Sequence, residues 1–233
     1  MKSVLEIKGL EFSYNRNKKV ISNLDLTIDP CSVTALVGPN GVGKSTLLKL
    51  AAGLLTNYTG SIGIQGYTPG TKNGLSLISY IPDSLFLPKD LTAKLLLDMH
   101  SNVFPNFSRD KASEILGQLD VPFDKSIKTF SKGMTAKLQI AIAMSKESAI
   151  YLLDEPFGGI DPLARDEVMK MIIKNYSDEG AVLISTHEIT DTESLYDRVV
   201  FLKNGVIERD EDIEEARMKG LSLKDIYMEV FSK

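Results

Sequence analysis

The N-terminal part of the chain alternates between hydrophobic and polar positions. From Val4 to Tyr14 and again from Val20 to Ile28, apolar side chains recur at about every second residue, with polar or charged residues between them. A period of two is typical of β-strands with one buried face and one face toward water. The polar stretch 15–19 between the two segments suits a turn. The pattern therefore predicts two antiparallel strands at the start of the chain.

Three later segments are short, continuous apolar runs. They are Val33–Val37, Ile150–Leu153 and Val182–Ile184. Such runs indicate strands buried on both faces, and strands that alternate with helices indicate a parallel sheet covered on both sides. The first run is followed by a helix that we expect from Thr46 to Ala52, with Gly53 as its C-terminal stop.

The long segment Leu91–Ser145 has helical patterns. Its clearest stripe places apolar residues at i, i+3, i+4 and i+7, with Ser108 as the expected N-cap. The residues of this stripe are Ala112, Ile115, Leu116 and Leu119. Asp161 followed by Pro162 predicts the start of another helix, which runs to about Tyr176.

The C-terminal part predicts a hairpin and a final helix. Two apolar segments flank Asn204-Gly205, a dipeptide that favours a tight hairpin turn. Ser222 and Asp225 have the spacing of a capping box, and an apolar stripe follows them. The residues of the stripe are Leu223, Ile226, Tyr227 and Val230. We expect this helix to pack on its own domain, with docking to a partner as the alternative.

The composition narrows the class of partner. The chain has 233 residues, 43% of them hydrophobic, which is enough for a sizeable core. Its formal net charge of −4 argues against nucleic acid as the main partner, because binding phosphates needs a basic surface. The single cysteine, Cys31, excludes an internal disulfide and is expected to be a small buried apolar residue. We see no secretory signal and no apolar run near the ~18 residues of a spanning helix, so we expect membrane contact only through a partner.

A glycine-rich loop lies between the first buried strand and its helix. It fits the pattern G-x-x-x-x-G-K-[ST], in which glycines let successive backbone N–H groups point at phosphate oxygens, and the helix N-terminus favours the same anion. The loop and the next residue are Gly38, Pro39, Asn40, Gly41, Val42, Gly43, Lys44, Ser45 and Thr46. We expect Lys44 to reach the β- and γ-phosphates and the Ser45 hydroxyl to bind Mg²⁺.

Two later strands end in polar residues of the kind that a hydrolase needs. The strand from Ile150 ends in Asp154 and Glu155. We expect Asp154 to hold the Mg²⁺ shell and Glu155 to act as the general base for the attacking water. The strand from Val182 ends in His187, which either contacts the γ-phosphate and orients the water or has a structural role.

The order of these motifs resembles the nucleotide-binding domain of ATP-binding-cassette (ABC) transporters over almost the whole chain. After the aromatic residue, phosphate loop and helical segment come a Ser-x-Gly signature, Leu-Leu-Asp-Glu-Pro, Gly-Ile-Asp-Pro at 159–162 and the strand that ends in histidine. A GTPase would carry Asn-Lys-x-Asp, whereas Asn-Lys-Lys-Val at 17–20 lacks the aspartate and precedes the loop.

The resemblance implies an α/β fold of the P-loop NTPase (RecA-like) class. It implies a parallel-sheet core, an N-terminal antiparallel β subdomain and an inserted α-helical subdomain at roughly residues 88–146, within a single domain of residues 1–233.

The resemblance also implies roles and partners. Tyr14 stacks on adenine, Ser131 and Gly133 cap the γ-phosphate of ATP held by the opposite subunit, and Asp161 lies in a loop that communicates across the dimer. The implied cofactors are ATP and Mg²⁺. The implied assembly is a head-to-tail dimer, formed with itself or with a second ATPase subunit. That dimer powers a membrane-spanning subunit on a separate chain, with the cassette at the cytoplasmic face of the cell membrane.

Three residues depart from the usual family pattern. The signature Leu-Ser-Gly-Gly-Gln is here Phe-Ser-Lys-Gly-Met, so Lys132 and Met134 replace glycine and glutamine, and Asp83 stands where many members have glutamine. Lys132 either adds positive charge at a phosphate site or points into water. Asp83 is expected to hold Mg²⁺ through its outer shell. These variants resemble subunits of drug, bacitracin-type and acetoin-utilisation exporters, an analogy that favours export.

Three other functions share parts of this pattern. A soluble ABC ATPase acting on DNA or ribosomes usually has a second cassette, a coiled-coil insertion or zinc cysteines, none of which is visible here. The intact Lys44, Asp154, Glu155 and His187 argue against a regulatory subunit without turnover, whereas the altered signature leaves this alternative open. A nucleotide kinase shares the phosphate loop but does not need Leu-Leu-Asp-Glu-Pro followed by histidine.

Overall fold

A three-stranded antiparallel sheet is formed by the N-terminal part of the chain. The structure, a computed structural model, describes residues 2–15, 18–83, 87–187 and 193–232. The sheet consists of β1 (Leu5–Phe12), β2 (Ile21–Ile28) and β4 (Thr59–Ile64), in the order β2-β1-β4. The predicted pair of antiparallel strands is thus confirmed. The third strand was not predicted, because Gly60 and Gly63 weaken its pattern.

A six-stranded sheet forms the centre of the molecule. Its order is β5-β6-β7-β3-β8-β9, and all neighbouring strands are parallel except the antiparallel pair β8 and β9. The strands are β3 (Ser32–Val37), β5 (Ile78–Ile81), β6 (Ile150–Asp154), β7 (Ala181–Thr186), β8 (Arg198–Lys203) and β9 (Val206–Asp212). The three continuous apolar runs are therefore the central parallel strands, as predicted.

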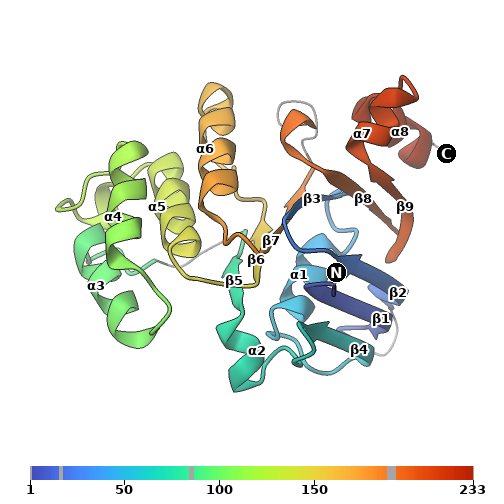
Figure 1. The fold of residues 1–233 in the computed structure, drawn as a ribbon, viewed down its shortest axis with the longest axis horizontal. Helices are drawn as coiled ribbons and strands as arrows, with labels where there is room; N and C mark the ends of the chain where they lie inside the picture. The colour runs from blue at the N-terminus through green and yellow to red at the C-terminus, as the bar shows by residue number, and fades with distance from the viewer. Residues whose placement is uncertain (1, 16–17, 84–86, 188–192, 233) are drawn as a thin grey trace.

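Both faces of this sheet are covered, because successive side chains of a strand point to opposite sides. On one face Leu36, Leu183 and Val200 pack with α1 (Lys44–Ala51) and the antiparallel sheet. On the other face Ala35 and Ile184 pack with α6 (Pro162–Asn175) and further helices. Figure 1 shows α1 and the antiparallel sheet below the central strands and α6 above them.

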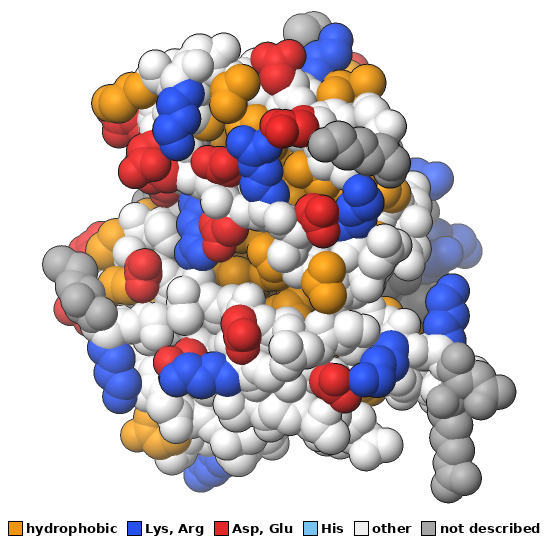
Figure 2. All heavy atoms as spheres, turned by 90° about the vertical axis from the view of Figure 1, so that its right-hand side faces the viewer, with side chains coloured by type: hydrophobic (Ala, Val, Ile, Leu, Met, Phe, Trp, Pro, Cys, Tyr) orange, Lys and Arg blue, Asp and Glu red, His pale blue; other side chains and the backbone are white. Residues whose placement is uncertain are grey.

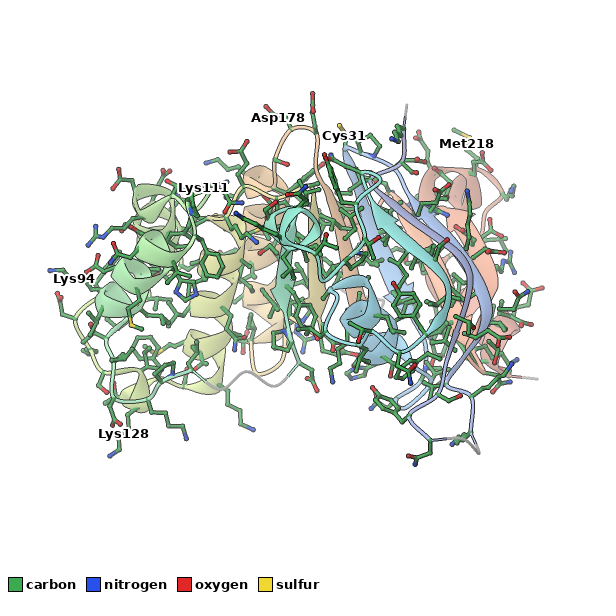
Figure 3. All side chains as sticks on the ribbon, turned by 90° about the horizontal axis from the view of Figure 1, so that it is seen from below. Cys31, Lys94, Lys111, Lys128, Asp178 and Met218 are labelled. Carbon is green, nitrogen blue, oxygen red and sulfur yellow. The ribbon has the colours of Figure 1, made fainter. Side chains whose placement is uncertain are left out.

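The segment 91–145 is helical, but in three pieces. They are α3 (Ala93–Val103), α4 (Arg109–Gln118) and α5 (Lys132–Met144), with a short 3₁₀ turn at Ile127–Thr129. Pro105 and Pro122 lie in the two breaks, where a proline cannot continue a helix. Ser108 caps α4 through a hydrogen bond from Lys111 N to its Oγ, as predicted. Figure 3 shows these helices as a group beside the sheets, with Lys94 and Lys128 pointing outward at the far end.

The C-terminal part forms the predicted hairpin and capped helix. Asn204 and Gly205 have φ values of 51° and 79°, which suit the tight turn between β8 and β9. After α7 (Ile213–Met218), the helix α8 (Leu223–Phe231) begins with the complete capping box of Ser222 and Asp225. Its buried stripe packs on the same core as α6, so the expectation that it packs on its own domain is confirmed.

The outer face beside this hairpin mixes charges of both signs. Figure 2 shows acidic and basic side chains interspersed with small apolar areas on the side where α7, α8 and β9 lie. Arg198 forms a forked pair with Asp210, and Arg209 bridges Glu211 and Glu229. These hydrogen-bonded carboxylates raise the pKa of both guanidinium groups above the ordinary value.

The expectation for Cys31 is wrong. Cys31 is exposed, with a positive φ of 57°, in the turn between β2 and β3, and its Sγ donates to Asp178 O at 2.8 Å. Figure 3 shows the two residues side by side at one end of the sheets. A turn that requires a left-handed residue exposes its side chain whatever that side chain's hydrophobicity. Two short helices, α2 (Lys72–Ser76) and α7, were also not predicted.

Among the described residues, none of the helices has the length and apolar character needed to cross a bilayer.

Candidate functional site

The glycine-rich loop joins β3 to α1, and its conformation requires glycine at two positions. A Cβ at Gly38 would lie 2.5 Å from the backbone oxygen of Leu202. Gly43 has φ of 118° and stands at the N-cap of α1 without a side-chain cap. The first N–H groups of α1 therefore have no capping side chain and face the cleft, where an anion can accept from them.

The cleft at this loop has a volume of about 530 Å³. The predicted site residues that line it are Tyr14, Asn40, Gly41, Gly43, Lys44, Ser45, Thr46, Asp83, Glu155 and His187. Gly38, Pro39 and Val42 complete the loop behind this lining. The structure thus brings together segments that are as much as 173 positions apart in the sequence (187 − 14 = 173).

Lys44, Glu155 and His187 form a chain of charged and polar contacts in the cleft. Lys44 is buried, donates from Nζ to Gly38 O at 2.7 Å and lies 3.5 Å from Glu155 Oε1. His187 Nδ1 lies 2.9 Å from Glu155 Oε2. Glu155 itself has a positive φ of 47°, an uncommon conformation for a residue with a side chain. The carboxylate is therefore held between a cation and an imidazole at the cleft wall.

Asp154 lies beneath this group and is buried. Its Oδ1 accepts from Ser45 Oγ at 3.0 Å and from Ser185 Oγ at 2.6 Å. The Ser185 hydroxyl also accepts from Glu155 N at 3.1 Å. Ser185 thus ties the two acidic residues to β7. We did not predict this role, although a hydroxyl within an otherwise apolar buried strand was a usable signal.

Asp154 Oδ2 is buried and, within the described residues, has no hydrogen-bond partner. A buried carboxylate oxygen without a partner is costly, so an additional ligand is expected beside it. Together with the Ser45 hydroxyl, this oxygen donor set suits a hard divalent cation such as Mg²⁺.

Tyr14 stands at the mouth of the cleft and is 55% exposed. Its hydroxyl lies 3.2 Å from Thr46 Oγ1, and its ring meets Phe12 edge to face with centroids 4.9 Å apart. These contacts fix the ring while leaving more than half of the side chain open to a flat ligand.

Five further residues line the cleft although sequence reasoning did not single them out. They are Val20, Phe157, Gly158, Arg165 and Thr186. Only the position of Thr186, directly before His187 at the end of a buried strand, carried a signal in the sequence.

The signature residues Ser131 and Gly133 lie outside this cleft. Ser131 is the N-cap of α5 and accepts from Met134 N at 3.1 Å. A Cβ at Gly133 would lie 2.8 Å from Gly159 O, so the start of α5 packs against the loop that leads to Asp161. Ser131, Lys132 and Asp161 are exposed, and Met134 is half-buried. None of these residues is among the described residues that line the cleft.

Comparisons with known proteins agree with this geometry. Residues 21–158 match the family described as "ABC transporter". The chain is 32% identical to the ABC-type transporter ATP-binding protein EcsA of Bacillus subtilis, over 98% of this chain and 96% of EcsA. It is 32% identical to the lantibiotic transport ATP-binding protein SrtF of Streptococcus pyogenes, over 91% and 93%. A solved ATP-binding subunit of an ABC transporter superposes with a TM-score of 0.84 at 29% identity, over 98% and 99%. The chain therefore belongs to the ABC transporter family as one of its ATP-binding subunits, which are ATPases.

Proposed function

We propose that Glu155 is the general base of ATP hydrolysis and that His187 orients the attacking water. The observation that supports this proposal most directly is the contact chain from Lys44 through Glu155 to His187 at the cleft wall. When ATP is bound, the Lys44 ammonium group would pair with the γ-phosphate instead of with Glu155. The carboxylate would then be free to accept a proton from water while His187 still holds its other oxygen.

The nucleotide itself would lie along the loop with its adenine on Tyr14. The loop N–H groups and the start of α1 supply donors for the phosphates, and the half-open Tyr14 ring supplies a stacking surface. The fixed contact between Tyr14 and Thr46 links the two ends of this binding surface.

Ser45 and Asp154 would hold Mg²⁺, with Asp83 in its outer shell. The support is the unpartnered Oδ2 of Asp154, the neighbouring Ser45 hydroxyl and the position of Asp83 on the same cleft. When bound, the ion neutralises charge on the β- and γ-phosphates. If Asp83→Ala left the Mg²⁺ dependence of turnover unchanged, the outer-shell role of Asp83 would be wrong.

The complete site would form between two chains arranged head to tail. The exposed start of α5, with Ser131 and Gly133, would cap the γ-phosphate bound by the other chain, and the adjoining Asp161 loop would sense it. Support comes from the position of these residues outside their own cleft. The partner would be a second copy or another ATPase subunit.

In the cell this dimer would drive a membrane-spanning subunit from the cytoplasmic face, in the direction of export. The likeness to the transporter subunits EcsA and SrtF supports the transport role. The direction rests on the form of the signature, which resembles that of exporter subunits. The alternative is a soluble ABC ATPase without a transport partner. Purification of the tagged chain from membranes separates the two. An associated ABC membrane subunit agrees with the transport role, whereas ribosomes or nucleic acid would indicate the alternative.

The enzymatic part is tested by Mg²⁺-dependent ATP hydrolysis over a range of protein concentrations. We expect a rate per subunit that rises with concentration, because two chains make the site. Glu155→Gln should lower turnover by about 100-fold or more, the range for loss of a general base, while ATP still binds. Turnover by Glu155→Gln at the wild-type rate would contradict the role of Glu155.

A further inference from the structure

Two buried polar atoms near the proposed metal site are left without hydrogen bonds. They are the hydroxyl of Tyr80 on β5 and Oδ2 of Asp154 on β6, and neither has a partner within the described residues. A buried hydroxyl and a buried carboxylate oxygen are each costly when unpaired. Each such atom calls for a partner, and one ligand shared between them would satisfy both.

The register of the sheet places these two side chains on one face. Tyr80 lies opposite Leu152 in the parallel pair of β5 and β6, and Asp154 follows Leu152 by two residues. Side chains two residues apart share a face, so Tyr80 and Asp154 both point toward α1. This is the side from which Ser45 donates to Asp154 Oδ1 at 3.0 Å. Neighbouring strands are about 4.8 Å apart and two residues span about 6.6 Å, so a tyrosine side chain can reach the region of the carboxylate.

The electrostatic surroundings agree with this placement. Burial raises the pKa of Tyr80 well above its ordinary value, and the negative charges of Asp154 and Asp83 raise it further. The phenol therefore stays protonated at any working pH and remains a hydrogen-bond donor. Since the two orphan atoms do not bond directly, a single water between them would satisfy both.

We propose that Tyr80 is a positioning residue for the metal site, whose hydroxyl donates through a water to Asp154 Oδ2 and thereby fixes the orientation of this carboxylate. The inference rests on the proposed roles of Ser45 and Asp154. Partners outside the ligand shell orient the ligands and tune the affinity for the ion. Tyr80 belongs to the four-residue strand β5, and Asp83 comes two residues after the end of that strand, so this segment would supply two groups to the site.

The test compares Tyr80→Phe with a matched control, Tyr151→Phe. Each variant removes one buried hydroxyl and keeps the ring. Tyr151 lies on β6, where its hydroxyl donates to Lys146 O at 3.0 Å and accepts from Ser148 N at 3.3 Å. Its hydrogen bonds are thus complete without any ligand.

Mn²⁺ binding to the full chain loaded with a non-hydrolysable ATP analogue is the direct readout. We expect Tyr80→Phe to raise the Mn²⁺ concentration for half-saturation about fivefold, as for loss of one net hydrogen bond. Its metal-free Tm should change little, because the hydroxyl bonds to no protein atom directly and reaches Asp154 only through a water. Tyr151→Phe should lower Tm by about 3 °C and leave Mn²⁺ binding unchanged.

The reverse pattern overturns the inference. If Tyr80→Phe lowers Tm as much as Tyr151→Phe does and leaves Mn²⁺ binding unchanged, the Tyr80 hydroxyl has a structural role only. Asp154→Asn separates this failure from failure of the metal site itself. If Asp154→Asn weakens Mn²⁺ binding and Tyr80→Phe does not, only the inference about Tyr80 is wrong. If neither change matters, the proposed metal site is wrong as well.

Discussion

The cleft at Lys44 and the start of α5 each contain a helix N-terminus, which favours an anion, but they differ in how their polar groups are satisfied. In the cleft, the N-cap of α1 is Gly43 without a side-chain cap, and Lys44 and Ser45 contact Glu155 and Asp154. At α5, Ser131 caps its own helix and stays exposed. The polar groups of the first region pair within one chain, whereas Ser131 is not among the described residues that line the cleft. If the proposed site is correct, folding builds one part of it and association of two chains builds the other.

The largest expected effect that separates the two regions comes from Ser131→Ala. It should lower turnover by about 10- to 100-fold, because the hydroxyl that would meet the transition-state phosphate in the proposed dimer is lost, while ATP binding to a single chain is unchanged. Ser108→Ala is the matched control, since Ser108 caps α4 in the same manner as Ser131 caps α5. Both variants should lose about 1 kcal/mol of stability as N-caps. Equal turnover in the two variants would mean that Ser131 serves only as a cap.

A smaller effect is expected within the cleft from Ser185→Ala. The hydroxyl donates to Asp154 Oδ1 at 2.6 Å and accepts from Glu155 N at 3.1 Å. Its loss should therefore let the side chain of Asp154 and the backbone at Glu155 move more. We expect about a 10-fold rise in the Mg²⁺ concentration required for half-maximal turnover, as for loss of an outer-shell partner. Titration of the rate with Mg²⁺ measures this. An unchanged Mg²⁺ dependence would show that the orientation of Asp154 does not depend on Ser185.

The smallest effect is expected from Lys132→Met at the start of α5. Lys132 is exposed in the single chain, and its charge would meet the phosphates of a nucleotide on the partner. We expect the ATP-dependent association to weaken about two- to threefold at low salt and the difference to vanish at high salt, where charges are screened. Light scattering across salt concentrations checks this. A difference that persists at high salt would contradict an electrostatic role.

The fold followed from the sequence where side-chain patterns were strong. The three apolar runs became the central parallel strands, and the capping box at Ser222 and the turn at Asn204-Gly205 lie where expected. Local chemistry determines these features, so a single sequence carries the signal. The same holds for the loop at Lys44, where Gly38 leaves no room for a Cβ and Gly43 has a positive φ.

The remaining features depended on distant contacts. The strand β5 has only four residues, and its tyrosine was overlooked because its position opposite Leu152, two residues before Asp154 on β6, is visible only in the folded chain. The role of Ser185 could not be predicted for the same reason, because its two hydrogen bonds join it to residues about 30 positions away in the sequence. Cys31 was misjudged because a turn, and not hydrophobicity, decides its exposure.

The measurement that tests the central claim most directly is complementation between two inactive variants. Lys44→Ala has a defective phosphate loop and an intact start of α5, whereas Ser131→Arg has the reverse. In a two-fold dimer each site takes its loop from one chain and its signature from the other, so a mixed dimer contains one intact site. We predict that the mixture hydrolyses ATP many-fold faster than either variant alone. A mixture no faster than the mean of the two separate rates would contradict a site built from two chains.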